Sequence, residues 1–395
     1  MGENKGNIAK VIAACVMFVL IAGLSACSSD PTPVPPLPQS TKRATVTVRP
    51  SATPVPTLAA NPLVITRTQA LDESLLKIVS GTYCTQGWRT AVFPASLALP
   101  VEPVKGDLLF EWNSSGTNDY ISFPGNPTYG LPSSYSIATS ADSTDGRDGN
   151  WLQVVDVTDN VARTRAHRFP FAGARWVRMT VTSAVPGPLG STVAIDQVDL
   201  HDASRGSDDT VFFMGDSITS TAFTRCPATQ PSVAALAHLV DPRRFPAMID
   251  GGVGGVNSGY GVSVIQDWLA LNPDFHIWAI GYGTNDAWQK VSPAIFEEQL
   301  QTLVDKIKAA GRVPVIARIP FSSKGPADAD VRALNLVVDR VTALNGLVPG
   351  PDLYAWFKTH TDELRSDGVH PSPQGTRSIN RLWYEALRPF YSKSP

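Results

Sequence analysis

The chain has 395 residues, of which 43% are hydrophobic and 17% are charged, and its formal net charge is −2. This composition excludes a mainly disordered chain, and the near-neutral charge argues against an extended basic surface that would bind nucleic acid. The length favours two folded domains over one.

An export signal is predicted at the N-terminus. Lys5 and Lys10 precede a short apolar run, residues 11–23, and the sequence Leu-Ser-Ala-Cys27 follows it. The run is shorter than the roughly 20 apolar residues that span a bilayer, and its flanks are those of a signal peptide. The ending resembles the lipobox of bacterial lipoproteins. This resemblance implies a signal peptide over residues 1–26, a lipid on Cys27 and a location at the extracytoplasmic face of the bacterial cell envelope. An uncleaved anchor helix is the alternative, and it would also hold the protein at a membrane.

A linker is predicted over residues 27–62. Nine of the 33 prolines fall between Pro31 and Pro62, among repeated Thr, Ser and Val. Such a composition buries too little apolar surface to offset its ordering entropy, so we expect an extended tether. Its last ten residues have an alternative reading as a proline-rich edge of the next domain.

Short apolar or alternating runs, separated by turn signals, follow over residues 63–204. Their spacing and the near absence of long helical periods predict an antiparallel β-sandwich. The expected strands are residues 107–112, 118–123, 133–139, 151–157, 174–182 and 192–200.

Two stretches of this segment, residues 160–169 and 174–181, resemble the discoidin-type, galactose-binding-like jelly roll. That resemblance implies sugar binding through aromatic, Arg or His side chains at loop ends. The candidates here are Trp151, Arg163, Arg165 and His167. Alternating Arg and aromatic residues also describe a strand with one solvated and one packed face, which is the alternative for each of them.

One disulfide is possible in the exported chain. Cys15 would be lost with the signal and Cys27 would carry lipid, which leaves Cys84 and Cys226 as a pair in an oxidising compartment. Two separate thiols are the alternative.

The pattern changes after Ser204, and strands and helices alternate over residues 205–395. This alternation predicts parallel βαβ units, with ligands bound beyond the carboxyl ends of the strands. The expected strands are residues 210–214, 275–280 and 313–319, and the expected helices are residues 233–239, 263–271, 294–310, 328–344 and 373–390.

Four separated motifs lie in this segment: Gly215-Asp-Ser217, Gly252-Val-Gly-Gly255, Gly283-Thr-Asn285-Asp286 and Asp367-Gly-Val-His370. In this order they resemble the four blocks of the SGNH (GDSL-type) hydrolase family. The resemblance implies a three-layer α/β/α, flavodoxin-like domain with a parallel sheet.

The chemistry of these motifs is that of a serine hydrolase. A serine hydroxyl needs a base within hydrogen-bond reach, and an imidazole is suited to that role. Ser217 is the predicted nucleophile, His370 the base, and Asp367 the carboxylate that orients the imidazole. The family resemblance further implies an oxyanion hole made of the Ser217 and Gly255 backbone N–H groups and the Asn285 side chain.

Two acidic residues beside the motifs have a structural interpretation. Asp216, next to the nucleophile, is expected to cap a helix, and Asp286 to brace its turn. The segment from Gly281 to Asp286 begins like a dinucleotide-binding fingerprint but has Asp in place of the third glycine. The sequence shows no metal-ligand set, and a serine mechanism requires neither a metal nor another cofactor.

The motifs predict a serine esterase that forms an acyl-serine intermediate. Export and the attached sandwich resemble two-domain carbohydrate esterases, which implies O-deacetylation of a polysaccharide or another sugar ester. Four aromatic residues near the motifs are candidates for a sugar-stacking wall, with a place in the core as their alternative. They are Tyr260, Trp268, Tyr282 and Trp288.

Three other functions stay open at this point. One is a lipase or thioesterase, another is transfer of an acyl group onto a glycan, and the third is a lipid-anchored glycan-binding protein with an inactive hydrolase domain. We expect a monomer whose partners are an ester substrate and, through Cys27, a membrane.

Overall fold

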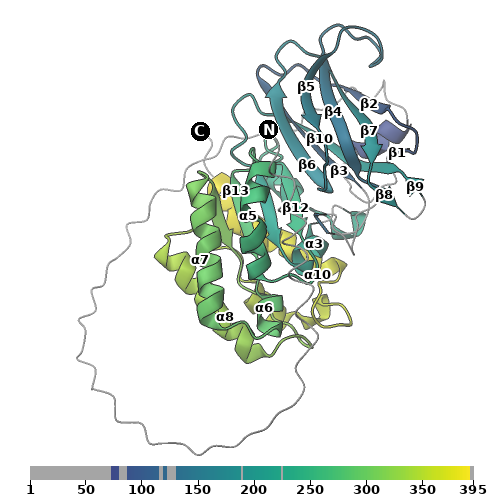
Figure 1. Ribbon diagram of the computed structural model, residues 1–395. Coiled ribbons are helices and arrows are strands. Elements are labelled where there is room, and N and C mark those ends of the chain that lie inside the picture. Colours follow the sequence, from purple (N-terminus) through teal and green to yellow (C-terminus); the bar gives the residue numbers. More distant parts are fainter. Residues whose placement is uncertain are drawn as a thin grey trace, which may run out of the picture. The chain divides into compact units, whose positions relative to one another are not determined.

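The computed structural model describes residues 73–79, 87–114, 119–121, 130–187, 190–223 and 226–391 (Figure 1). These residues all belong to one compact unit, Ser51–Pro395. The predicted signal peptide, the predicted linker, Cys27 and Cys84 lie outside the described residues.

The N-terminal part of the described chain is built from two antiparallel four-stranded sheets, ordered β1-β10-β3-β6 and β2-β7-β4-β5. A short helix, α2, precedes them. Two short paired strands, β8 and β9, lie between β7 and β10 in the sequence. The bounds are α2 (Glu73–Ile78), β1 (Trp88–Thr90), β2 (Ala95–Pro100), β3 (Asp107–Ser114), β4 (Pro132–Ser140), β5 (Leu152–Val157), β6 (Thr164–Pro170), β7 (Trp176–Ala184), β8 (Pro186–Gly187), β9 (Gly190–Ser191) and β10 (Val193–Asp202).

Both sheets contribute to one hydrophobic core. Phe110 and Trp112 from β3 and Tyr135 and Ile137 from β4 are buried in the same cluster, although the two strands belong to different sheets. The Trp112 and Tyr135 rings meet edge to face with centroids 5.3 Å apart. We call these two sheets, together with the described segments that connect their strands, the sandwich.

The predicted antiparallel sheets are confirmed, with differences in individual strands. Of the expected strand 118–123, only residues 119–121 are described, and Ile121 forms an isolated bridge to Ala162. The sequence prediction missed β1, β2 and β6. Strand β2 is flanked by Pro94 and ends at Pro100, which suggests a loop. Strand β3 shows no clean alternation because seven of its eight residues are buried, as expected for a strand covered on both faces.

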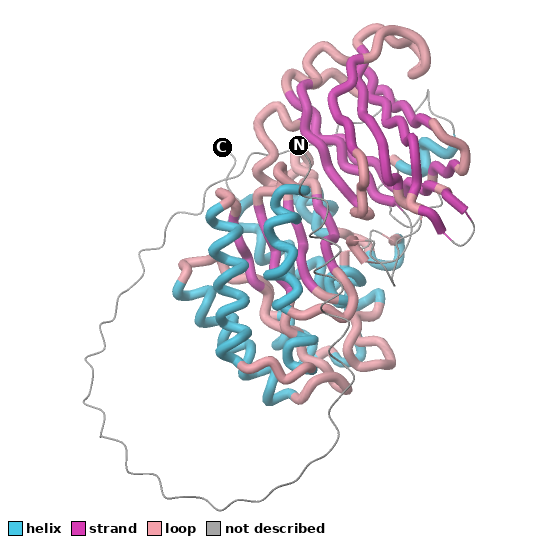
Figure 2. The backbone as a smooth tube through the Cα atoms, viewed as in Figure 1, coloured by secondary structure: helices cyan, strands magenta, loops and turns pink. Residues whose placement is uncertain are grey.

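The C-terminal part of the described chain contains a parallel four-stranded sheet of order β12-β11-β13-β14, surrounded by helices (Figure 2). This order is that of a doubly wound α/β sheet. The strands are β11 (Val211–Gly215), β12 (Met248–Gly252), β13 (Ile277–Gly281) and β14 (Val313–Ile316). The helices are α3 (Ser217–Ala222), α4 (Val233–Val240), α5 (Ser258–Leu271), α6 (Thr284–Trp288), α7 (Pro293–Ala309), α8 (Asp328–Leu344), α9 (Leu353–Thr359) and α10 (Pro373–Tyr391), with single 3₁₀ turns η2 (Pro227–Thr229) and η3 (Thr361–Glu363).

Alternate residues of the central strand β11 serve two different cores. Phe212 and Met214 are buried with residues of α5, α7 and α8, whereas Val211 and Phe213 are buried with residues of α3, α4, α9 and α10. The sheet is therefore covered by helices on both faces, and the predicted α/β fold with a parallel sheet is confirmed. Within the described residues, every helix is too short or too polar to cross a membrane.

Strand β12 is the one strand of this sheet that the sequence prediction missed. Its sequence, Met-Ile-Asp-Gly-Gly, contains an acidic residue and two glycines, all of which are rare in strands. The strand nevertheless pairs in register with β11 along its whole length, from Met248 opposite Val211 to Gly252 opposite Gly215. Its end and the end of β11 meet at the same edge of the sheet, where the first two sequence motifs are brought together.

Candidate active site

The proposed nucleophile lies at the carboxyl end of β11. Ser217 is the first residue of α3, and Asp216 caps this helix by accepting a hydrogen bond from the Ile218 N–H at 2.9 Å. The expected capping role of Asp216 is thus confirmed. A side chain at Gly215 would collide with the hydroxyl of Thr219, so the tight strand-to-helix turn requires a residue without a Cβ.

Ser217, His370 and Asp367 form one hydrogen-bonded chain. His370 Nε2 lies 2.8 Å from Ser217 Oγ, and His370 Nδ1 lies 2.9 Å from Asp367 Oδ2. Since a carboxylate only accepts hydrogen bonds, Nδ1 carries the proton and Nε2 is left to accept the serine hydroxyl proton. The structure brings the three predicted residues together in the arrangement that a serine hydrolase uses.

The carboxylate of Asp367 is held ionised by its surroundings. Burial opposes ionisation, but hydrogen bonds from the Val369 and His370 backbone N–H groups and from the His370 side chain lower the pKa of Asp367 to about 2. Its charge is therefore present throughout the neutral range and stabilises the imidazolium that forms when His370 takes a proton. The site is open to solvent, because the side chains of His370 and Asp367 are 32% and 46% exposed.

The glycine-rich loop after β12 carries the predicted oxyanion donor. The Gly252 N–H donates to Asp250 Oδ1 at 3.0 Å, and the Gly254 N–H donates to Asp119 Oδ1 at 2.6 Å. The N–H groups of two of the three candidate glycines are thus already hydrogen-bonded within the protein. Gly255 has a φ of 75°, a left-handed conformation that favours glycine, and is exposed. Gly255 remains the best candidate for the donor in this loop.

Asn285 connects the third motif to the same loop. It lies in the first turn of α6, and its Nδ2 donates one hydrogen bond to the Val256 carbonyl oxygen at 2.8 Å. An amide NH₂ has two hydrogens, so this contact fixes the side chain while the second hydrogen can serve an oxyanion. Asp286 is expected to brace its own turn, but its carboxylate accepts hydrogen bonds from the Ser258 backbone and hydroxyl, and so it ties α6 to the start of α5.

Asp216 is fully buried, and its ionisation is unfavourable. Burial raises its pKa to about 7, assisted by the nearby charge of Asp286 and opposed by the Ile218 hydrogen bond. Its second carboxyl oxygen has no hydrogen-bond partner among the described residues.

This environment predicts a pH dependence of stability. Because the pKa of Asp216 is higher in the folded protein than its ordinary value of 3.8, unfolding releases a proton between these values and stability falls as pH rises through 4–7. From pH 5 to pH 8 the wild type should lose roughly 2–3 kcal/mol more of its free energy of unfolding than Asp216→Asn does. Denaturant unfolding of both proteins at the two pH values measures the difference. Equal losses would contradict the assignment.

The predicted aromatic wall is largely absent. Trp268 and Tyr282 are only 3% and 2% exposed and belong to the core, so Tyr282 is corrected from a substrate-stacking residue to a packing residue. Burial raises its pKa well above the ordinary value. Tyr260 is half-buried against the same core. Trp288, at the end of α6, is 56% exposed and is the one member of the predicted set that is free to stack on a substrate.

Two of the predicted sugar-binding residues of the sandwich are engaged inside the protein. Arg163 is buried and pairs with Asp250 at 3.2 Å. His167 contacts the Tyr135 hydroxyl at 2.7 Å, and burial, with the charge of Arg165, lowers its pKa to about 3.

Trp151 is held in a similar way. Its indole N–H donates to the Asp148 carbonyl oxygen at 2.8 Å, and the Arg178 guanidinium lies 3.9 Å from the centre of its ring. Such a cation–π contact occupies a face that a sugar would otherwise stack on.

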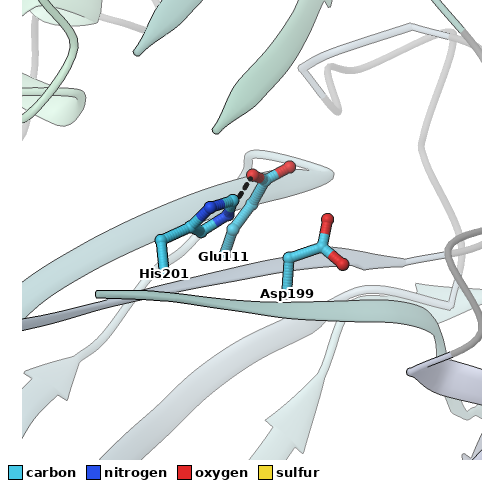
Figure 3. A group of neighbouring side chains, drawn as sticks. All are labelled: Glu111, Asp199 and His201. Atoms are coloured by element: carbon cyan, nitrogen blue, oxygen red, sulfur yellow. Dashed lines mark ion pairs between the residues drawn. The ribbon is translucent and has the colours of Figure 1, made fainter. Parts of the chain in front are cut away.

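A group of potential metal ligands, Glu111, Asp199 and His201, is buried on β3 and β10 (Figure 3). Their candidate ligand atoms all lie within 4.8 Å of one another, and His201 Nε2 is 3.4 Å from Glu111 Oε2. Burial alone would lower the pKa of His201, but the hydrogen bond and charge of Glu111, with the charges of Asp199 and Asp209, raise it.

Cys226 is disulfide-bonded. Cys84, the partner predicted from the sequence, lies outside the described residues. Asp119 contacts the glycine-rich loop through the Gly254 N–H, and sequence reasoning missed this contact. It lies in the sandwich segment, 135 residues before Gly254, and no local pattern marks it.

Comparison with known proteins assigns the α/β part. Residues 213–377, less than half of the chain, match the model of the GDSL-like Lipase/Acylhydrolase family. A lipase/acylhydrolase from Enterococcus faecalis is 22% identical, covers 45% of this chain and 95% of its own, and has a TM-score of 0.39. The acetylxylan esterase Axe2 from Geobacillus stearothermophilus is 22% identical over 47% of this chain and 95% of its own, with a TM-score of 0.37. No curated protein matches the chain. On the family match, the segment that carries all four motifs is a GDSL/SGNH hydrolase domain.

Proposed function

We propose that this protein is a serine esterase that hydrolyses carboxylic esters through an acyl intermediate on Ser217. The observation that carries the proposal is the unbroken hydrogen-bonded chain from Ser217 Oγ through His370 to Asp367, with contacts of 2.8 and 2.9 Å. Ser217, at one end of this hydrogen-bonded series, lies at the carboxyl edge of the parallel sheet. The loop that carries Gly255 and the helix that carries Asn285 begin at the same edge.

The first half-reaction acylates the serine. Ser217 Oγ attacks the ester carbonyl carbon while His370 Nε2 accepts the hydroxyl proton. The carbonyl oxygen becomes an oxyanion, which the Ser217 and Gly255 backbone N–H groups and the Asn285 amide stabilise. The ester C–O bond then breaks, and His370 returns the proton to the leaving alcohol. Asp367 keeps the imidazole oriented and stays ionised.

The second half-reaction regenerates the enzyme. A water molecule gives a proton to His370 Nε2 and attacks the acyl carbon of the acyl-serine. The second tetrahedral intermediate collapses, the carboxylic acid leaves, and the proton returns to Ser217 Oγ. Every proton that His370 accepts is thus returned within the same half-reaction.

A short acyl group on a sugar is the substrate class we propose. The side chains of His370 and Asp367 are 32% and 46% exposed, so a bulky alcohol such as a glycan chain can approach the serine from solvent. The exposed Trp288 offers an aromatic face of the kind on which sugar rings stack. A long acyl chain would instead favour an apolar channel in which to bury its methylene groups.

We also propose that the protein works outside the cytoplasm, as a lipid-anchored monomer at the bacterial cell envelope. The sequence around Cys27 and the proline-rich composition of residues 27–62 support this location. The disulfide at Cys226 adds support, because disulfides persist in oxidising compartments.

Substrate preference is tested by comparing p-nitrophenyl acetate with p-nitrophenyl palmitate and then measuring acetate release from acetylated xylan. The full chain in detergent is expected to hydrolyse the acetate ester faster by tenfold or more and to release acetate from the glycan. Ser217→Ala is the control for background hydrolysis. A clear preference for palmitate would contradict glycan deacetylation and favour a lipase.

The same samples separate the remaining alternatives. Transfer of an acetyl group from p-nitrophenyl acetate to a glycan acceptor, exceeding release of free acetate, would favour an acyltransferase. Retention of glycan with no ester turnover would favour an inactive glycan-binding protein.

A further inference from the structure

The sandwich contacts the edge strand of the parallel sheet and the loop after it. Strand β12 is the last strand of the order β12-β11-β13-β14, so one of its sides has no partner strand within this sheet. His201 Nδ1 donates to the Phe245 carbonyl oxygen at 2.9 Å, just before the strand begins. The Met248 N–H, at its first residue, donates to Glu111 Oε2 at 3.3 Å. Buried groups of β10 and β3 therefore satisfy polar groups at the start of β12.

The contacts continue to the end of the strand. Asp250, in the middle of β12, pairs with the buried guanidinium of Arg163 at 3.2 Å. The Gly252 carbonyl oxygen, at the last residue, accepts the Tyr120 N–H at 2.9 Å. Burial raises the pKa of Asp250 to about 6, and the charge of Arg163 opposes this rise.

The side chain of Tyr120 packs in the core that β11 forms with α5, α7 and α8. It is fully buried, and its ring meets the rings of Phe212 and Trp268 edge to face, with centroids 5.3 and 5.1 Å away. Asn272 Nδ2 donates to its hydroxyl at 2.9 Å. With its ring and backbone held, the neighbouring Asp119 has a defined direction.

Asp119 reaches the oxyanion loop directly. Its Oδ1 accepts the Gly254 N–H at 2.6 Å, one residue before Gly255. A Cβ at Gly254 would lie only 3.3 Å from that oxygen, so the carboxylate sits close against the loop backbone. The peptide unit that joins Gly254 to Gly255 carries the N–H group assigned to the oxyanion hole. The direction of that N–H therefore depends on how Gly254 is held.

We propose that Asp119 is a positioning residue for the oxyanion hole, and that the sandwich acts in catalysis by holding the loop Gly252–Gly255 in place. This inference rests on the proposed esterase function. An oxyanion donor is effective only when it is already aimed at the position that the developing charge will occupy. Displacement of a catalytic group by about 1 Å can cost about 100-fold in rate. Gly255 has a left-handed backbone and no side chain that would hold it, so its aim comes from its neighbours.

The test compares Asp119→Ala and Asp119→Asn with the wild type in p-nitrophenyl acetate hydrolysis by the full chain. Asp119→Ala is expected to lower kcat by about 10-fold to 100-fold with little change in KM, because an oxyanion contact is made mainly in the transition state. Asp119→Asn keeps an oxygen that can accept the Gly254 N–H and should recover most of the loss. Asp156→Ala removes an exposed carboxylate from β5 of the same sandwich and should leave kcat unchanged.

Two further readouts separate the possible failures. Hydrogen exchange of a peptide covering residues 250–257 should be faster in Asp119→Ala than in the wild type, whether or not the protein is an esterase. A wild type without Ser217-dependent turnover would contradict the proposed function and leave the exchange result to decide whether Asp119 holds the loop. A wild type with Ser217-dependent turnover, together with unchanged kcat and exchange in Asp119→Ala, would overturn the positioning role alone. If the alanine variant does not fold, a kcat of Asp119→Asn more than 100-fold below wild type would also overturn it.

Discussion

Ser217→Ala is expected to lower kcat for ester hydrolysis by about 10⁴-fold or more without unfolding the protein. In serine hydrolases, removal of the nucleophile alone costs about as much as removal of the whole triad, because the residues act as a unit. His370 Nε2 lies 2.8 Å from Ser217 Oγ. Alanine at position 217 removes the hydroxyl group that His370 would deprotonate, and with it the nucleophile. Steady-state kinetics with p-nitrophenyl acetate measure the loss, and circular dichroism checks the fold.

The matched control is Ser263→Ala. Ser263 is an exposed serine of α5 whose hydroxyl donates to the Tyr260 carbonyl oxygen at 2.7 Å, within its own helix. Its replacement should leave kcat within about twofold of the wild type, since exposed substitutions away from a site have small effects. Activity retained by Ser217→Ala would mean that another residue is the nucleophile.

Asn285→Ala is expected to lower kcat by about 100-fold to 1,000-fold, the range typical of removing one oxyanion-hole donor. The loss should fall on kcat and on kcat/KM alike, with KM nearly unchanged, because the contact is made to the transition state. The side chain has a defined place, since its Nδ2 also donates to the Val256 carbonyl oxygen at 2.8 Å. Kinetics over a range of ester concentrations give both parameters.

A loosened loop is the competing explanation for such a loss, and Asn257→Ala tests it. Asn257 caps α5 by accepting the Tyr260 N–H at 3.1 Å, and it lies in the loop that Asn285 braces. Its removal should destabilise the protein by about 1 kcal/mol, as helix-cap losses do, with a much smaller effect on kcat. Equal losses of kcat in Asn257→Ala and Asn285→Ala would mean that Asn285 supports the loop and donates nothing to the oxyanion.

The α/β sheet and its helices are largely predictable from the sequence, because their patterns are local. The helix expected over residues 328–344 is found as Asp328–Leu344, and the strand expected over residues 210–214 is found as Val211–Gly215. Ser217 follows β11 and Asn285 follows β13, so parallel topology places both at one edge of the sheet. His370, 153 residues after Ser217, lies between η3 and α10 and follows no strand of this sheet, so only the resemblance of the four motifs predicts its place beside Ser217.

The contacts between the sandwich and β12 are not predictable in the same way. Arg163 has the sequence context of a strand residue facing solvent or a sugar, and it is buried because Asp250 lies opposite. Tyr120 is expected on a strand of the sandwich, but its side chain is buried in the core that β11 forms with α5, α7 and α8. Each of these positions is decided by a residue far away in the chain, and hydrophobic periodicity carries no information about such partners.

The central claim is that Ser217 carries an acyl group during turnover. The most direct measurement is mass spectrometry of the protein quenched with acid during reaction with p-nitrophenyl acetate, followed by peptide mapping. The account predicts an added acetyl group on the peptide that contains Ser217, and none in Ser217→Ala treated identically. Ester turnover by the wild type with no acyl group on Ser217 at any quench time, or with the acyl group on another residue, would contradict it.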